Sequence, residues 1–230
     1  RTERAGFAAS GDAATTLRCL MGAKAYSDHK RRLRRLGERG TVEFVSARDV
    51  DGVRTGMEDF LYLEASGWKG RERSALLADR HRSAFAREAI NGLAAQGRAR
   101  TYTLRLDGEP VGSLVVLLCE GEAAAWKTAF DERYAPQRPG ALVAALATEA
   151  MVADPAIRFL DSCAVSDHGV ANRLWPGRLT IGTLVVALRP DANALVSRVA
   201  EDLERERQRL RNRWRRRSRL QGWLSSFRKP

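Results

Sequence analysis

Residues 100–154 contain the pattern that most limits what this chain can fold into. Three strand-like runs, 100–106, 111–119 and 123–130, are joined by the short turns DGEP and EGEA. An Asp-Gly turn between such runs is typical of a β-hairpin, so the pattern predicts an antiparallel meander. An apolar helix over 140–154 and a strand over 156–164 follow. A meander that leads into a β-α-β crossover predicts an α/β mixed sheet, not a doubly wound parallel sheet.

The segments on either side complete the expected order of elements. A basic helix is expected over 27–40, a strand over 41–47 and helices over 48–67 and roughly 79–96. Phe85, Ala89 and Leu93 form the expected inner stripe of the last of these helices. After the crossover strand, a short helix over 168–175, a final strand over 181–190 and a long charged helix from 192 to about 220 are expected.

The positive charge is concentrated in two flanking segments. The net charge is +12, of which residues 24–39 carry +5 and residues 197–230 carry +8, so the rest of the chain is nearly neutral. Residues 197–230 alternate arginine with a loose apolar stripe at 203, 210, 214, 224 and 227. A basic helix of this kind suits an anionic membrane surface, and its composition also suits RNA. A solvated tail that packs one side against the domain is the third alternative.

The cysteines and the apolar runs narrow the environment. Cys19, Cys119 and Cys163 are widely spaced and form no CxxC pair, which favours a reducing cytoplasm without a disulfide framework or a metal site. The apolar runs are far shorter than the roughly 18–20 residues of a membrane span, and no signal peptide is visible. The expected location is therefore the cytoplasm, with peripheral binding at the inner face of the membrane through 197–230. Because residue 1 is arginine, a fragment or processed product is expected.

Three strings resemble the GNAT acyltransferase superfamily, and within it the subgroup related to FemAB and to the cellulose-biosynthesis protein CelD. They are FLYLEASGWKGRERSALL (60–77), AFDERYAPQRPGALV (129–143) and LDSCAVSDHGVANRLW (160–175), and the resemblance covers roughly residues 41–190. It implies a GNAT-like fold that transfers an acetyl or other acyl group from acyl-CoA to an amine, on a sugar or a cell-envelope intermediate.

The resemblance also implies a division of the chain. The subgroup usually carries two GNAT-like modules, so residues 1–40 are expected to be the remnant of an upstream module with its linking helix. That missing N-terminal module would be a partner of the domain. Residues 41–190 would form the acyltransferase domain, and residues 191–230 a basic amphipathic helical tail.

The donor site is expected where the meander meets the apolar helix. The string QRPGAL resembles the superfamily's pyrophosphate loop, with Leu142 in place of its last small residue. A helix N-terminus with a glycine suits an anion, because free N–H groups and the helix dipole point at it. The residues expected to bind acyl-CoA are Lys127, Gln137, Arg138 and Gly140.

Polar side chains near the strand ends supply the candidates for proton transfer and acceptor binding. The candidates for acid, base and acceptor roles are Asp131, Tyr134, Asp161 and His168, because carboxylates and a histidine can exchange protons with an amine. By analogy with the family, the acceptor pocket is expected to involve Glu64, Trp68, Lys69 and Trp126.

Two alternative functions stay open at this point. An aminoacyl-tRNA-dependent ligase of the FemAB kind would use the basic segments for tRNA. A non-catalytic, membrane-associated accessory protein of polysaccharide synthesis is the other alternative, since Leu142 departs from the loop pattern and the helix at 168–175 lacks the tyrosine that GNAT enzymes often place there.

Overall fold

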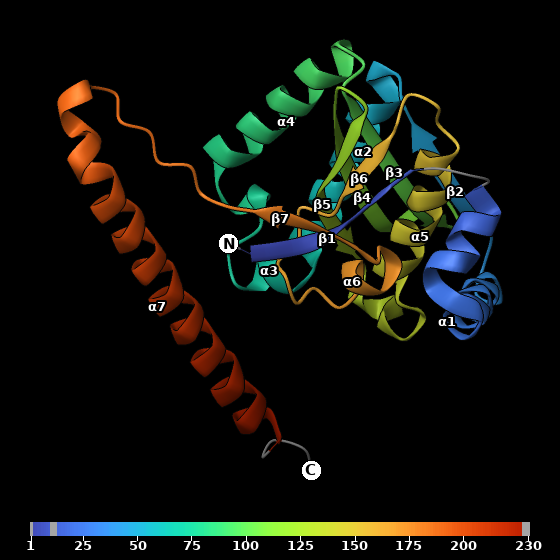
Figure 1. Cartoon of the computed structure of the whole chain (residues 1–230). Helices are drawn as coiled ribbons and strands as arrows, with labels where there is room; N and C mark the ends of the chain where they lie inside the picture. Colours follow the sequence, from blue (N-terminus) through green and yellow to red (C-terminus); the bar gives the residue numbers. More distant parts are fainter. Residues whose placement is uncertain (1, 10–12, 227–230) are drawn as a thin grey trace. The chain divides into compact units, whose positions relative to one another are not determined.

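The computed structural model describes residues 2–9 and 13–226 of the chain (Figure 1). The elements, in chain order, are β1 (Thr2–Ala8), α1 (Ala13–Gly37), β2 (Val42–Ala47), α2 (Val50–Ser66), α3 (Trp68–Arg71), η1 (Leu76–Ala78), α4 (Arg80–Ala95), β3 (Ala99–Leu106), β4 (Glu109–Cys119), β5 (Glu122–Phe130), η2 (Glu132–Gln137), α5 (Pro139–Val152), β6 (Phe159–Asp161), α6 (Ala171–Leu174), β7 (Gly177–Ile181), η3 (Pro190–Ala192) and α7 (Asn193–Ser226).

A mixed seven-stranded sheet confirms the predicted fold class. Its strand order is β2-β3-β4-β5-β6-β1-β7. The meander β3-β4-β5 is antiparallel, and Asp107 and Gly108 both have positive φ in the first hairpin, as a type I′ turn requires. Strand β6 then pairs parallel with β5 after the α5 crossover. The predicted order of meander, apolar helix and crossover strand is therefore correct.

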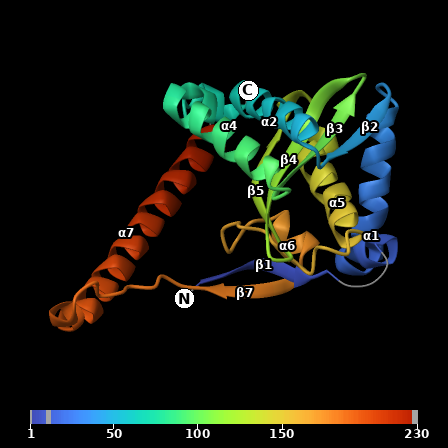
Figure 2. The same cartoon turned by 90° about the horizontal axis from the view of Figure 1, so that it is seen from above.

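Helices cover the sheet on two faces, and each face has its own apolar cluster. Helices α1 and α5 lie side by side on one face, while α2 and α4 cover the other (Figure 2). The first cluster joins α1 and α5 to the sheet through residues such as Leu36, Leu142 and Leu160. The second joins α2 and α4 to it through residues such as Phe60 and Ile90. Strand β4 is buried over most of its length because helices pack on both of its faces.

Three predicted elements differ from the structure. Helix α4 buries Ser83, Ala86, Ile90 and Ala94, whereas Phe85 is exposed, so the predicted inner stripe was placed one residue off. The helix expected at 168–175 is only the single turn α6. The final strand is β7, which ends at Ile181, where the predicted strand over 181–190 would begin; β7 is the edge strand of the sheet and pairs with β1 alone.

Residues before 41 take part in the same sheet as the domain. Strand β1 pairs antiparallel with β6, with Gly6 opposite Asp161 and Ala8 opposite Phe159. Thr2–Thr180 form one compact unit, so the boundary expected at residue 40 falls inside this unit, and the boundary expected at 190 falls beyond its end. The origin of residues 1–40 in an upstream module stays a prediction.

The segment from Ile181 onward forms a second unit, in which α7 is the main element. Leu195, Val199, Leu203 and Leu210 are exposed on this helix. The side chains of Trp214 and Leu224 and all of Phe227 lie outside the described residues, so the predicted stripe is seen only in part. Within the described part of the chain, no helix combines the length and hydropathy needed to cross a membrane.

Candidate active site

The sheet opens between two parallel strands, β5 and β6. Their pairing consists of Glu122 with Phe159, Ala123 with Leu160 and Ala124 with Asp161. Strand β6 ends there, whereas β5 continues to Phe130. The second half of β5 therefore has β4 on one side and no strand on the other, which leaves backbone groups at this edge for a ligand.

A β-bulge in β5 coincides with this opening. Val115 of β4 faces Lys127 and Val116 faces Ala125, so Trp126 is the extra residue. A bulge bends its strand and redirects the side chains and backbone groups next to it. The bulge thus changes the direction of Trp126 and Lys127 at the point where β5 loses its neighbour.

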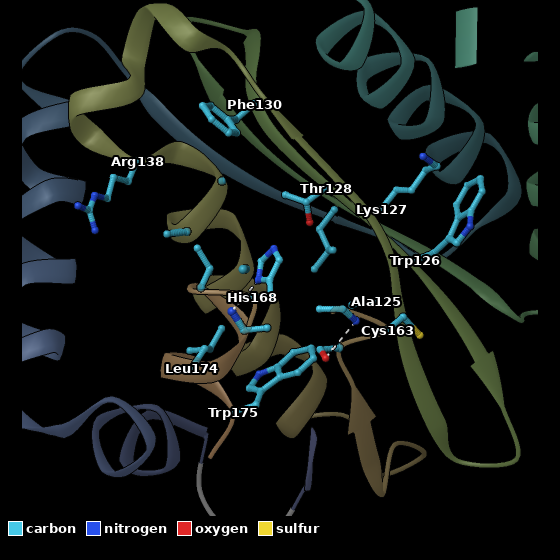
Figure 3. Close-up of a pocket in the computed structure, with 18 of the residues that line it drawn as sticks. Ala125, Trp126, Lys127, Thr128, Phe130, Arg138, Cys163, His168, Leu174 and Trp175 are labelled. Carbon is cyan, nitrogen blue, oxygen red and sulfur yellow. Dashed lines mark hydrogen bonds between the residues drawn. The ribbon is translucent and has the colours of Figure 1, made fainter. Parts of the chain in front are cut away.

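A cavity of about 590 Å³ lies at the opening (Figure 3). Strand β5, the start of α5, the segment after β6 and helix α6 supply its walls. Its apolar walls include Leu114, Ala144 and Trp175, and the indole Nε1 of Trp175 donates to Thr148 Oγ1 at 3.0 Å. The charged or titratable residues that line it are Lys69, Lys127, Arg138, Cys163 and His168, and none of the described lining residues is an aspartate or glutamate.

The N-terminus of α5 forms one end of the cavity. Arg138 precedes the helix with a positive φ of 54°, Pro139 is its first residue, and no side chain caps it. Ala141 and Leu142 donate their N–H groups to Arg138 O, and Gly140, directly before them, lies against the Phe130 ring. The Arg138 side chain extends away from Thr128 and Lys127 in Figure 3. The cavity is therefore bordered here mainly by backbone.

A buried carboxylate with two lysines forms the opposite end. Glu64 Oε1 accepts hydrogen bonds from Lys69 Nζ at 2.8 Å and Lys127 Nζ at 3.2 Å, and Glu64 Oε2 accepts one from Leu76 N–H at 2.8 Å. Burial raises the pKa of Glu64, but these hydrogen bonds and the two positive charges outweigh burial and hold it below its usual value. Glu64 is thus an ionised carboxylate, and it lies behind the lysines without lining the main cavity.

His168 lies among the cavity-lining side chains (Figure 3). Its Nδ1 accepts a hydrogen bond from Ala171 N–H at 3.1 Å. Because this bond uses the Nδ1 lone pair, the proton of the neutral ring is on Nε2. In this arrangement the ring offers a donor to a ligand, and the nitrogen lone pair that a base needs is occupied.

The three other residues predicted for proton transfer lie outside the cavity lining. Asp131 caps η2 through Arg133 N–H and also binds the Arg133 guanidinium at 2.6 Å. Burial raises the pKa of Asp131, but the hydrogen bonds from Arg133 lower it by more. The guanidinium carbons of Arg39 and Arg133 lie 5.3 and 5.9 Å from the centre of the Tyr134 ring.

Asp161 binds the guanidinium of Arg4 from β1 and accepts Cys163 N–H at 2.9 Å. The ion pair joins the N-terminal strand to the end of β6. In this position Asp161 fixes the sheet beside the cavity.

The other predicted binding residues are divided between the cavity and its surroundings. Lys69, Trp126, Lys127, Arg138 and Gly140 line it, as does His168. Gln137 and Trp68 do not. Trp68 is half-exposed, and its backbone N–H donates to Glu132 Oε1 at 2.8 Å.

Several cavity residues carried no sequence signal of their own. Thr128, Phe130, Ala141, Ala144 and Leu174 line the cavity but were not among the predicted site residues. The small residues Ala141 and Ala144 are three positions apart and therefore share a face of α5. This spacing was the only sequence feature that could have indicated a cavity wall. Among the described residues, no group of three or more histidine, cysteine or acidic side chains lies close enough together to hold a metal ion.

The solved structures that match this chain share little sequence with it. A conserved protein of unknown function from Bacteroides thetaiotaomicron VPI-5482 matches 70% of this chain at 10% identity and a TM-score of 0.46, and this chain covers 50% of its length. The aminoglycoside acetyltransferase meta-AAC0020 from an uncultured soil metagenomic sample, solved with sisomicin, matches 64% of this chain and 97% of its own at 14% identity and a TM-score of 0.45.

The PaiA N-acetyltransferase from Thermoplasma acidophilum, solved with coenzyme A, matches 48% of this chain and 72% of its own at 11% identity and a TM-score of 0.35. No curated protein matched the chain. The sequence family of acetyltransferase (GNAT) domains matches residues 23–168, which is more than half of the chain and includes β5, α5 and the segment after β6. The chain belongs to this acetyltransferase (GNAT) domain family.

Proposed function

We propose that this acetyltransferase takes its acyl group from acetyl-CoA or another acyl-CoA, bound between β5, β6 and α5. It would transfer that group to the amine of a small molecule in polysaccharide or cell-envelope synthesis. The observation that carries the proposal is the open edge of β5, which faces a cavity bordered by the N-terminus of α5. The cell-envelope acceptor rests on the FemAB/CelD-like strings alone.

The donor end of the cavity fits a pyrophosphate group. The α5 N-terminus has no side-chain cap, and Ala141 and Leu142 donate their N–H groups to Arg138 O, so the Gly140 N–H and the helix dipole favour an anion at this point. Gly140 has no side chain to cover the backbone, and the described lining residues include no carboxylate that would repel a phosphate. Arg138 adds a positive charge at the same end.

The thioester of acyl-CoA supplies an activated acyl group for attack by an amine. The backbone of β5 beyond Ala124 would hold the acyl chain, because its edge has no strand partner. His168 would donate from Nε2 to the thioester oxygen or to the departing sulfur. Burial and the nearby Asp161 raise the pKa of the Cys163 thiol, so Cys163 is poorly suited to act as a nucleophile. Direct transfer, in which the protein mainly orients the substrates, fits these residues.

The proposal is tested by CoA binding to the whole chain. Calorimetry with CoA and acetyl-CoA should show micromolar binding, and Arg138→Asn should weaken it about three- to tenfold, which corresponds to about 0.7–1.4 kcal/mol. Asparagine tolerates the left-handed backbone of this position. Arg73→Asn is a matched control, because Arg73 also has a φ of 54° and does not line the cavity.

Protection of a cysteine from alkylation tests where the ligand binds. In a Cys19→Ser/Cys119→Ser variant, Cys163 is the one remaining cysteine, and it lines the cavity. Bound CoA should slow its alkylation at pH 8.5, and added tRNA should not. Absence of CoA binding, or binding without protection of Cys163, would overturn the proposed donor site. Charged tRNA that binds and protects Cys163 in place of CoA would favour the FemAB-like ligase. Binding of no donor at all would favour the non-catalytic accessory protein.

A further inference from the structure

The end of the cavity opposite Gly140 holds two lysines that share one carboxylate. The ammonium groups of Lys69 and Lys127 both bind Glu64 Oε1, which leaves one positive charge without a partner in this cluster. Both lysine side chains are about a quarter exposed, whereas that of Glu64 is 1% exposed. Both lysines line the cavity, whereas the buried Glu64 cannot reach a ligand there.

Glu64 holds the lysines in place, and its burial keeps an acceptor from reaching it. Its second oxygen is occupied by Leu76 N–H. The neighbouring carboxylate, Glu132, is occupied by Trp68 N–H and the Arg71 guanidinium. Both carboxylates at this end are thus already paired with positive side chains, which disfavours the ammonium groups of a polycationic acceptor.

The two ammonium groups are also oriented by aromatic rings. Lys69 Nζ lies 5.9 Å from the centre of the Trp68 ring, and Lys127 Nζ lies 5.8 Å from the centre of the Trp126 ring. Cation–π contacts of this kind restrict a lysine without neutralising it. The positive charge at this end is therefore both fixed and available.

The lysine pair and the donor end are separate. Figure 3 shows Lys127 and Arg138 on opposite sides, with Thr128 and His168 between them. Lys127 belongs to the part of β5 that has lost its β6 neighbour, so an anion bound to it lies beside the place where the acyl group would be held.

We propose that the acceptor is an amine that also carries an oxyanion, either a phosphate or a carboxylate, and that Lys69 and Lys127 bind this oxyanion while Glu64 positions them. This inference rests on the proposed function, because it assigns the lysine end to the acceptor once the α5 end is taken by the donor. The anion would neutralise the unpaired charge and hold the amine near β5, whereas an acceptor with only positive charges would be repelled.

Three amino sugars that share the same amine and differ in the anionic group that they carry test the proposal. Glucosamine has no oxyanion, glucosamine 6-phosphate has a phosphate and muramic acid has a carboxylate. Their dissociation constants are measured by calorimetry with the whole chain, with and without saturating CoA, and acetylation is followed by mass spectrometry. At least one anionic sugar should bind ten or more times more tightly than glucosamine, and the phosphate and carboxylate arms show which oxyanion is preferred.

Single lysine variants connect the preference to the residues. Lys127→Gln and Lys69→Gln should each reduce the preference for the anionic sugar at least fivefold, and the CoA dissociation constant is measured in both variants because the sequence placed Lys127 at the donor. Lys127→Arg should keep most of the preference for the anionic sugar, because arginine keeps the positive charge. Lys24→Gln is the matched control, since Lys24 is an exposed lysine of α1 that does not line the cavity. Each single variant leaves Glu64 one ammonium partner, so the fold is expected to persist.

The outcomes separate this inference from the proposed function. Equal binding of all three sugars, binding of none, or a preference that survives both lysine variants would overturn the anionic acceptor. If a lysine variant weakens CoA binding as much as it weakens binding of the anionic sugar, the lysines bind the donor and the inference is wrong. If the unmodified protein does not bind CoA, the proposed function is wrong. The sugar measurements without CoA then still decide whether the lysine pair selects an oxyanion.

Discussion

The two ends of the cavity are built in different ways. At the α5 end, Arg138 in a left-handed conformation precedes an uncapped helix N-terminus, so the positive charge comes from backbone dipoles together with Arg138. At the other end, the charge comes from side chains of α2, α3 and β5 that meet at Glu64. One end is a local property of a few consecutive residues, and the other depends on three segments being correctly packed.

This difference has consequences for mutation. A backbone site tolerates most side-chain changes around it, because its donors remain in place. A side-chain cluster around a buried carboxylate is sensitive to the loss of any member, because the remaining charges stay desolvated. Substitutions at the Glu64 end should therefore have larger effects on stability than substitutions at the Gly140 end.

The largest effect is expected for Glu64→Gln. Removing the negative charge leaves two lysine ammonium groups close together with no shared partner, and breaking a buried ion pair generally costs about 3–5 kcal/mol. Because both lysines are partly exposed and can turn toward water, a loss of about 3 kcal/mol in unfolding free energy is expected, measured by urea denaturation. Glu58→Gln is the control, since Glu58 pairs with Arg87 at the surface and should cost less than about 1 kcal/mol. Equal losses in the two variants would contradict the comparison.

The unfolding free energy should depend on pH mainly through a buried histidine of α1, the helix that packs beside α5. His29 is buried on α1, which packs beside α5, and burial, together with the charges of Lys30 and Arg32, lowers its pKa from 6.5 to about 4. The folded protein thus binds a proton less readily than the unfolded chain. This part of the stability is complete above pH 6.5 and is lost as the pH falls toward 4. The loss is about 2 kcal/mol by pH 5.

Glu149 on α5 opposes part of this loss, because burial raises its pKa and makes its protonation favour the folded state. Thermal unfolding between pH 7.5 and 5 measures the net slope. His29→Leu should flatten it, and His81→Gln, at an exposed histidine of α4, should leave it unchanged. A slope that is the same in His29→Leu would rule out His29 as its source.

The same difference between local and distant contacts explains what the sequence could predict. The meander, the start of α5 at Pro139-Gly140 and the crossover strand follow from turn residues and apolar runs that lie close together in the chain. Glu64 and Lys69 were also predicted as binding residues, but only through the family resemblance. The hydrogen bond from Lys127 to Glu64 joins residues that are 63 positions apart, so no local sequence pattern indicates it.

Asp131 and Asp161 show where residue types mislead. Both carboxylates stand at strand ends, where ligands often bind, and both are occupied by arginines in the structure. Arg133 is only two residues from Asp131, so that pairing was visible in principle. Arg4 is 157 residues from Asp161 and lies on a strand that the sequence did not predict. Phe85 misplaced the inner face of α4 because a large apolar residue was assumed to be buried, and apolar side chains are common at protein surfaces.

The smallest effect is expected at the backbone end, for Gly140→Ala. A Cβ at this position would lie 3.0 Å from Cδ1 of Phe130, whose ring is partly exposed and can shift by a few tenths of an ångström. Alanine costs less backbone entropy than glycine in a helix, so the unfolding free energy should stay the same or rise by up to about 1 kcal/mol. The added methyl group should nevertheless weaken CoA binding about threefold in calorimetry, because it crowds the N–H group of residue 140 at the helix start. Gly92→Ala on α4, where a Cβ meets no atom within 4 Å, should bring the same gain in stability and leave CoA binding unchanged. If Gly140→Ala lowers stability as much as Glu64→Gln does, the α5 end is not the tolerant backbone site described above, and the contrast between the two ends is lost.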